Sequence, residues 1–169
     1  MKIIKLGAAL AGVAMSIGTL AMSGFPAQAS TVQASTAHPS SALAASPIRL
    51  YKIYYNSPGP DRGGNASLNA EYVELHNTAG SAINLTDWVL HDGGQRHTYT
   101  FPSFTLKAHG YVLIHTGRGG TTPSQLYWGQ SWYVWNNDGD TATLKDRHND
   151  VIGRCSYSDP HERRSYKNC

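Results

Sequence analysis

From Ile48 onward the chain consists of short runs in which apolar and polar residues alternate, separated by turn-forming residues. In the segment EYVEL (71–75), for example, Val73 and Leu75 fall on one face of an extended strand and Glu74 on the other. About eight such runs follow at a spacing of roughly ten residues, and none has a 3.6-residue helical period. This pattern predicts an all-β fold, an antiparallel β-sandwich of about eight strands. The expected core comprises Val73, Leu75, Trp88, Leu90, Phe101, Val112, Ile114 and Leu144.

The first 29 residues have the pattern of a secretory signal peptide. Lys2 and Lys5 precede an uncharged apolar run, and the sequence AQA (27–29) forms a typical cleavage site before Ser30. A membrane anchor that is never cleaved is the alternative interpretation of the same segment. We expect cleavage, and therefore a secreted, extracellular protein that either stays on the cell wall or diffuses away.

Loss of the signal peptide changes the interpretation of the charge. The whole chain has 14 Lys and Arg against 11 Asp and Glu, so removal of two lysines leaves 12 against 11, a net charge of +1. A nearly neutral protein gains little from phosphate groups, which argues against a nucleic acid partner. No later segment approaches the roughly 20 apolar residues of a membrane span. Residues 30–47, rich in Ser, Ala, Thr and Pro, are expected to form a disordered linker.

The two cysteines are interpreted in the light of export. In an oxidising compartment Cys155 and Cys169 are expected to form a disulfide rather than remain free thiols. The segment 156–168 between them is charged and has almost no aliphatic side chain, so burial alone would not hold it. A bridge that closes a loop of this size contributes about 3 kcal/mol in the chain-entropy model. We therefore expect a folded domain over 48–157 and a C-terminal tail, 158–169, closed by the disulfide.

The order of motifs over residues 48–157 resembles the lamin tail domain, and in particular its stand-alone secreted bacterial members. The resemblance rests on NAEYVELHN (69–77), INLTDWVLHD (83–92), YTFP (99–102), Leu106 with GYVLIH (110–115), WNNDGDTATL (135–144) and DVI (150–152). It implies an immunoglobulin-like β-sandwich with a binding or tethering role. It also implies a protein without catalytic residues or a cofactor, because the family has no established active site.

One alternative function rests on histidine chemistry. His91, Asp92, His97 and His115 lie close in the sequence and could serve a small secreted metal-dependent hydrolase. Their spacing, however, matches neither a helical H-x3-H pair nor an H-x-H pair on one strand face. Solvated histidines at outward and turn positions explain the pattern without a metal. We therefore expect no metal site and no enzyme.

A run of aromatic residues provides the candidate binding site. Five aromatic side chains fall within residues 127–135, and on a strand Trp132 would face away from Tyr133 and Trp135, so they cannot all be buried together. Exposed aromatic surface often marks a binding site. The predicted binding residues are Trp128, Trp132, Tyr133 and Trp135, with Arg118 from a preceding loop. Flat aromatic rings suit a cell-wall glycan and a protein partner equally. The alternative is that these aromatic residues have a structural role and cover the open end of the sandwich.

Overall fold

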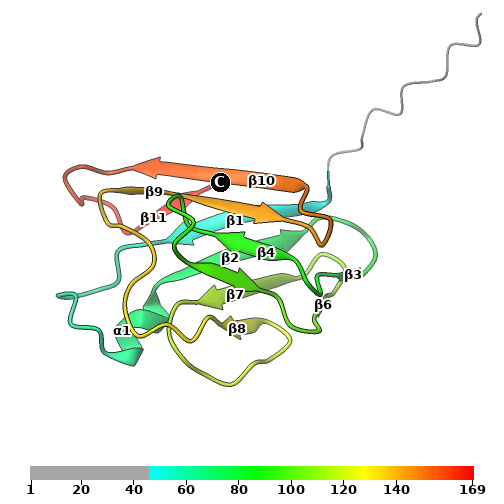
Figure 1. The fold of residues 1–169 in the computed structure, drawn as a ribbon, viewed down its shortest axis with the longest axis horizontal. Coiled ribbons are helices and arrows are strands. Elements are labelled where there is room, and N and C mark those ends of the chain that lie inside the picture. Colours follow the sequence, from blue (N-terminus) through cyan, green and yellow to red (C-terminus); the bar gives the residue numbers. More distant parts are fainter. Residues whose placement is uncertain (1–45) are drawn as a thin grey trace, which may run out of the picture. The chain divides into compact units, whose positions relative to one another are not determined.

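The computed structural model describes residues 46–169, shown in Figure 1. The predicted signal peptide and most of the predicted linker lie outside these residues. The described chain forms one short helix, α1 (Asn65–Ala70), and the strands β1 (Ile48–Tyr54), β2 (Tyr72–Asn77), β3 (Ile83–Asn84), β4 (Val89–His91), β5 (Thr98–Thr100), β6 (Thr105–Leu106), β7 (Tyr111–His115), β8 (Gln125–Tyr127), β9 (Gly139–Lys145), β10 (Val151–Ser158) and β11 (Tyr166–Asn168). The sequence predicted about eight strands. The described part of the chain has eleven, and the short strands β3, β6, β8 and β11 were not predicted.

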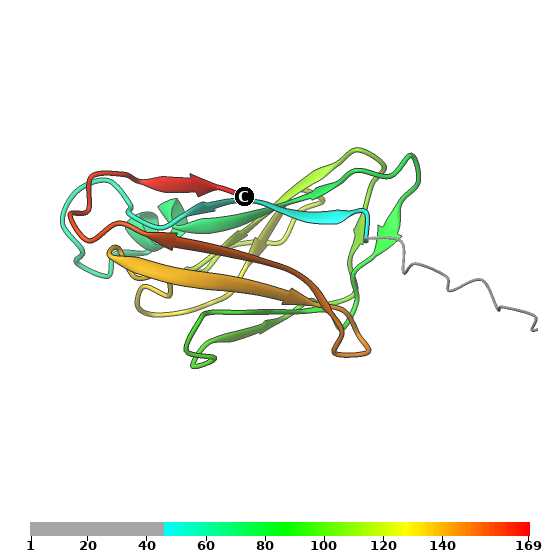
Figure 2. The same cartoon turned by 90° about the horizontal axis from the view of Figure 1, so that it is seen from above.

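Two sheets pack face to face and form a sandwich (Figures 1 and 2). The first has five strands in the order β11-β1-β2-β7-β8, and the second has four in the order β10-β9-β4-β5. Strands β3 and β6 form a separate two-stranded pair. The predicted all-β sandwich is therefore confirmed. It is antiparallel except at one edge of the first sheet, where β8 runs parallel to β7.

The core between the sheets contains every residue that the alternation assigned to it. Those eight side chains are at most 8% exposed, and burial of each large apolar side chain contributes about 1.5–3 kcal/mol. Larger rings from less regular segments complete the core, among them Tyr55 and Trp135. Within residues 46–169, no helix combines the length and the apolar character needed to cross a membrane.

Strand β1 changes its alternation midway because it contains a β-bulge. Ile48 and Leu50 point into the core, the register with β2 shifts between Leu50 and Lys52, and Ile53 is the next inward residue. The extra residue, Tyr51, is exposed. The bulge thus keeps both halves of the strand apolar on the inner face, and it moves the tyrosines of β1 to the outer face.

The predicted disulfide joins the two sheets along one side of the sandwich. Cys155 lies in β10, an edge strand of the four-stranded sheet, and Cys169 follows β11, an edge strand of the other sheet. Their Cα atoms are 5.6 Å apart. The tail is also held by its backbone, because β11 pairs with β1 and the Cys169 N–H donates to the Tyr51 carbonyl at 2.9 Å. The C-terminal segment is therefore an additional strand as well as a covalently closed loop.

Removal of the bridge should destabilise the protein without changing its fold. We expect the double variant Cys155→Ala/Cys169→Ser to lose about 3 kcal/mol of unfolding free energy in urea, because the unfolded chain regains the entropy of an open loop. Its far-UV circular dichroism should match that of the parent, since the remaining strands keep their partners. An unchanged urea midpoint would show instead that β11 pairing alone holds the tail.

Candidate functional site

The aromatic segment 127–135 leaves the sheet after Tyr127 and continues as a loop from β8 to β9. Trp135 is 1% exposed and belongs to the core, and the Trp128 ring packs against that core, with its centroid 6.1 Å from the Trp135 ring. Trp132, in contrast, is 60% exposed. Trp128 and Trp135 therefore pack with the core, and Trp132 is the exposed indole of the segment.

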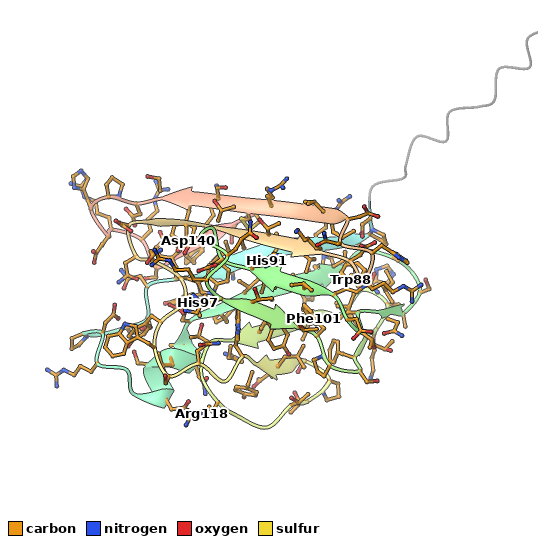
Figure 3. The ribbon with its side chains drawn as sticks, in the orientation of Figure 1. Trp88, His91, His97, Phe101, Arg118 and Asp140 are labelled. Atoms are coloured by element: carbon orange, nitrogen blue, oxygen red, sulfur yellow. A yellow bond between two sulfur atoms is a disulfide. The ribbon has the colours of Figure 1, made fainter. Side chains whose placement is uncertain are left out.

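Helix α1 holds the remaining predicted binding residues. The Tyr133 hydroxyl shares a hydrogen bond of 2.7 Å with Ser67 in the helix. The Arg118 backbone is fixed by two asparagines of α1: the Arg118 carbonyl accepts from Asn65 and Asn69, and its N–H donates to Asn65. Figure 3 shows Arg118 beside this helix. Its backbone is thus anchored, and its exposed side chain stays available to a ligand.

The Trp132 ring lies directly over the backbone of the loop that precedes α1. A Cβ atom at Gly63 would be 2.7 Å from the indole, and Gly63 has a φ of +69°. Both observations favour glycine at this position. The exposed indole therefore has a fixed support, and binding through Trp132 stays a prediction.

A buried carboxylate ties the loops at this end of the sandwich to β2. Glu71 is 0% exposed, and its Oε1 accepts hydrogen bonds from the Thr116 hydroxyl at 2.6 Å and from the Val134 N–H at 2.8 Å. Its Oε2 has no partner among the described residues. Burial raises the pKa of Glu71 to about 7, although the hydrogen bonds from the Thr116 hydroxyl and the Val134 N–H act in the opposite direction. Glu71 is therefore a structural group, with no access to a substrate.

The four residues of the alternative metal site do not come together. His97 Nδ1 lies 2.9 Å from Asp92 Oδ2, and Figure 3 shows His91 and His97 in the region of the four-stranded sheet. His115 belongs to β7 in the other sheet, where its Nδ1 donates to the Asn69 carbonyl at 2.6 Å. The His115 side chain points outward, as predicted, but neighbouring rings cover it. The expectation that His115 is solvated is therefore wrong. Over residues 46–169, no three His, Cys, Asp or Glu side chains are grouped so that they could hold a metal ion.

In the loop 136–140, the Asp140 carboxylate accepts hydrogen bonds from residues next to it in the chain and from a neighbouring turn. Asp140 Oδ1 accepts from the N–H groups of Gly93 and Thr141 at 2.8 and 2.7 Å, and its Oδ2 accepts from the Asn136 side chain at 3.1 Å. These hydrogen bonds fix the backbone at the start of β9. The loop is thus a hydrogen-bonded turn, in agreement with its sequence.

The outer face of the five-stranded sheet carries a row of rings that the sequence analysis did not recognise. The row, called here the aromatic row, takes one residue from each strand: Tyr166, Tyr54, Tyr72, His115 and Tyr127, in the order of the sheet. Neighbouring ring centroids are 6.2, 5.4, 5.8 and 5.0 Å apart. All four contacts join residues that are directly paired in the register, so the row crosses the whole width of the sheet.

Three further rings lie on the same face. His76 stacks on Tyr111 with a centroid distance of 4.1 Å, and the bulge residue Tyr51 contacts both. Between this group and the aromatic row lies an ion pair of Lys52 and Glu74, 3.9 Å apart. The only sequence signal for this surface was a tyrosine at an outward position in several strands, and no single segment stands out.

Comparison with known protein families agrees with the geometry. The model of the Lamin Tail Domain family matches residues 41–159, which contain both sheets of the sandwich except β11. The resemblance over 48–157 noted in the sequence is thereby confirmed, and the stand-alone secreted organisation stays a prediction. No curated protein is significantly similar to this chain in sequence.

Glu71 should make the stability of the protein depend on pH. The folded protein binds the Glu71 proton more tightly than the unfolded chain does, because the pKa is about 7 in the fold and 4.5 ordinarily. This contribution to stability is fully present below the ordinary pKa and is lost as the pH rises to about 7. We expect a loss of a few kcal/mol from this group, since one pKa unit corresponds to about 1.4 kcal/mol.

The matched variant is Glu71→Gln, which resembles the protonated acid in shape. Urea unfolding should show equal stability of variant and parent at acidic pH and a more stable variant above neutrality. A constant difference across the whole range would contradict the raised pKa.

Proposed function

Because the chain belongs to the lamin tail domain family, a non-enzymatic immunoglobulin-like family, we propose that it is an exported binding module without catalytic activity. Its ligand is a glycan of the cell surface or the extracellular matrix. The binding surface is the outer face of the five-stranded sheet, with the aromatic row at its centre.

Export is supported by two independent features. The pattern of residues 1–29 is that of a signal peptide, and this segment lies outside the described structure. The disulfide between Cys155 and Cys169 is of a kind that persists in oxidising compartments and is rare in the cytoplasm.

The aromatic row is the observation on which the ligand class depends. Neighbouring strands are about 4.8 Å apart, so a row across five strands extends over roughly 19 Å. This length suits an extended chain of sugar rings, which would contact the tyrosines on either side of the buried His115 ring, better than a single small molecule. Tyrosine offers both a flat apolar face for a sugar ring and a hydroxyl for its polar edge.

The groups beside the row favour a glycan over a protein partner. The adjacent register positions carry Lys52, Glu74 and Gln125, with Leu113 as the single aliphatic residue between them. The core of a protein interface is typically depleted in charge. Charged and amide groups next to stacked rings are instead suited to the many hydroxyl groups of a polysaccharide.

Co-sedimentation with insoluble cell wall, chitin and cellulose tests this proposal. The protein is expressed as the full chain in a host that exports it, and the variant Tyr72→Ala/Tyr127→Ala is compared with Trp132→Ala. We expect the first variant to bind the retained polymer about thirtyfold more weakly, since each of its two missing rings contributes on the order of 1 kcal/mol. Trp132→Ala removes the indole that the sequence predicted to bind, and it should bind like the parent because Trp132 lies in the loop after β8 and not in the aromatic row.

Thermal unfolding of each variant establishes that it is folded. Loss of binding in Trp132→Ala alone would move the site to the loop after β8. Failure of the parent to bind any of the three polymers would contradict the glycan ligand and leave a protein partner as the alternative.

A further inference from the structure

A groove of about 560 Å³ lies at the β11 end of the aromatic row. It is lined by Tyr54 of β1 and by residues 163–168, which lead into β11 and form it. These residues follow the end of the family match at residue 159. The groove is thus built by the part of this chain that β11 pairing and the disulfide attach to the sandwich.

The groove is lined by cations that form no ion pair within residues 46–169. Arg163, Arg164 and Lys167 all line it and are exposed. Of the ion pairs found over residues 46–169, neither involves one of these three cations. A fourth cation is near, because Lys52 Nζ lies 5.4 Å from the centre of the Tyr166 ring.

The carboxylate nearest in sequence is already occupied within the fold. Asp159 is buried, and its Oδ2 accepts from the Tyr55 hydroxyl at 3.1 Å and from the Arg164 N–H at 2.7 Å. Burial by itself would raise the pKa of Asp159, but the backbone donors of Arg164 and Arg163 hold it below its usual value. Asp159 therefore shapes the turn before β11 and does not line the groove. Glu162 is exposed and also lies outside the lining.

Flat rings and two arginines line the same groove. The Tyr54 and Tyr166 rings are stacked with their planes 19° apart, and Arg163 and Arg164 precede Tyr166 in the chain. Lys167 lies on the opposite face of β11, because it is paired with the core residue Ile53. A neutral sugar chain would use the rings but not the cations. An arginine fork, in contrast, matches the two oxygens of a carboxylate. The surface therefore fits a ligand in which a flat ring and a carboxylate belong to the same unit.

We propose that the ligand is a polysaccharide of uronic acid units, whose rings lie on the aromatic row and whose carboxylates bind Arg163 and Arg164 in the groove. This inference rests on the proposed glycan-binding function and adds the class of glycan to it. A polymer with phosphate groups between open-chain alcohols would satisfy the cations but offer no ring to Tyr54 and Tyr166.

The test compares two forms of one polymer. Binding of the purified full chain, with its disulfide intact, is measured by titration calorimetry with polygalacturonate and with its methyl ester, which has the same rings and no charge. We expect the acid form to bind about tenfold more tightly, and this preference to shrink at high ionic strength. The variant Arg163→Gln/Arg164→Gln should lose the preference and still bind the ester like the parent.

A charge-matched control variant is Arg96→Gln/Lys107→Gln, which removes two exposed cations away from the groove. It should behave like the parent, and an equal loss of preference in it would overturn the proposed site. Equal binding of the acid and the ester would overturn the uronic acid assignment while the glycan-binding function stands. Binding of neither form, together with no retention on the insoluble polymers, would contradict the glycan function itself.

Two further probes separate uronic acids from anions in general. Polyphosphate carries charge without rings, and single-stranded DNA carries phosphates with bases that also stack on tyrosine. We expect both to bind at least about tenfold more weakly than polygalacturonate. Comparable or tighter binding of either probe would overturn the proposal.

Discussion

The register of β2 between β1 and β7 is the constraint on which the core and the outer surface both depend. On the inner side this register buries Val73 and Leu75, and on the outer side it aligns Tyr54, Tyr72 and His115. A slip of one residue would exchange the two faces and place Val73 in water. The apolar core thereby fixes the position of rings that it does not contact. The rings of the aromatic row have fixed positions because the packing of the core beneath them fixes the register of the strands.

Buried polar groups at the two ends of β2 hold that register in place. Glu71 binds the Thr116 hydroxyl and the Val134 N–H at one end. At the other end, Asn77 is fully buried, and its side-chain amide donates to the carbonyls of Ser81, Leu106 and Lys107. A shifted strand would leave these groups without partners in the protein interior, which is costly. The same bonds determine how the loops leave the sandwich.

The β11 edge of the five-stranded sheet matters both for the stability of the protein and for its proposed function. Without β11, the edge of β1 would expose unpaired backbone groups, a known risk for aggregation. The tail covers this edge, and the disulfide to β10 holds it there. The segment that protects the edge also carries Tyr166 and the cations of the groove. The residues that protect the edge of β1 are thus also part of the candidate ligand surface.

The sequence by itself determined the sandwich, the inward residues such as Leu75 and Ile114, and the disulfide, because strand alternation and cysteine pairing leave local signals. The short strands β4 and β5 were found because Trp88 and Phe101 beside them extend the alternation, whereas β3 and β11 have too few residues to show a period by themselves. Only the tertiary structure placed Trp135 in the core and left Trp132 outside, since an irregular loop has no periodicity from which burial can be inferred. The aromatic row was likewise decided by tertiary structure. Its rings come from strands far apart in the sequence, and pairing between those strands depends on long-range packing.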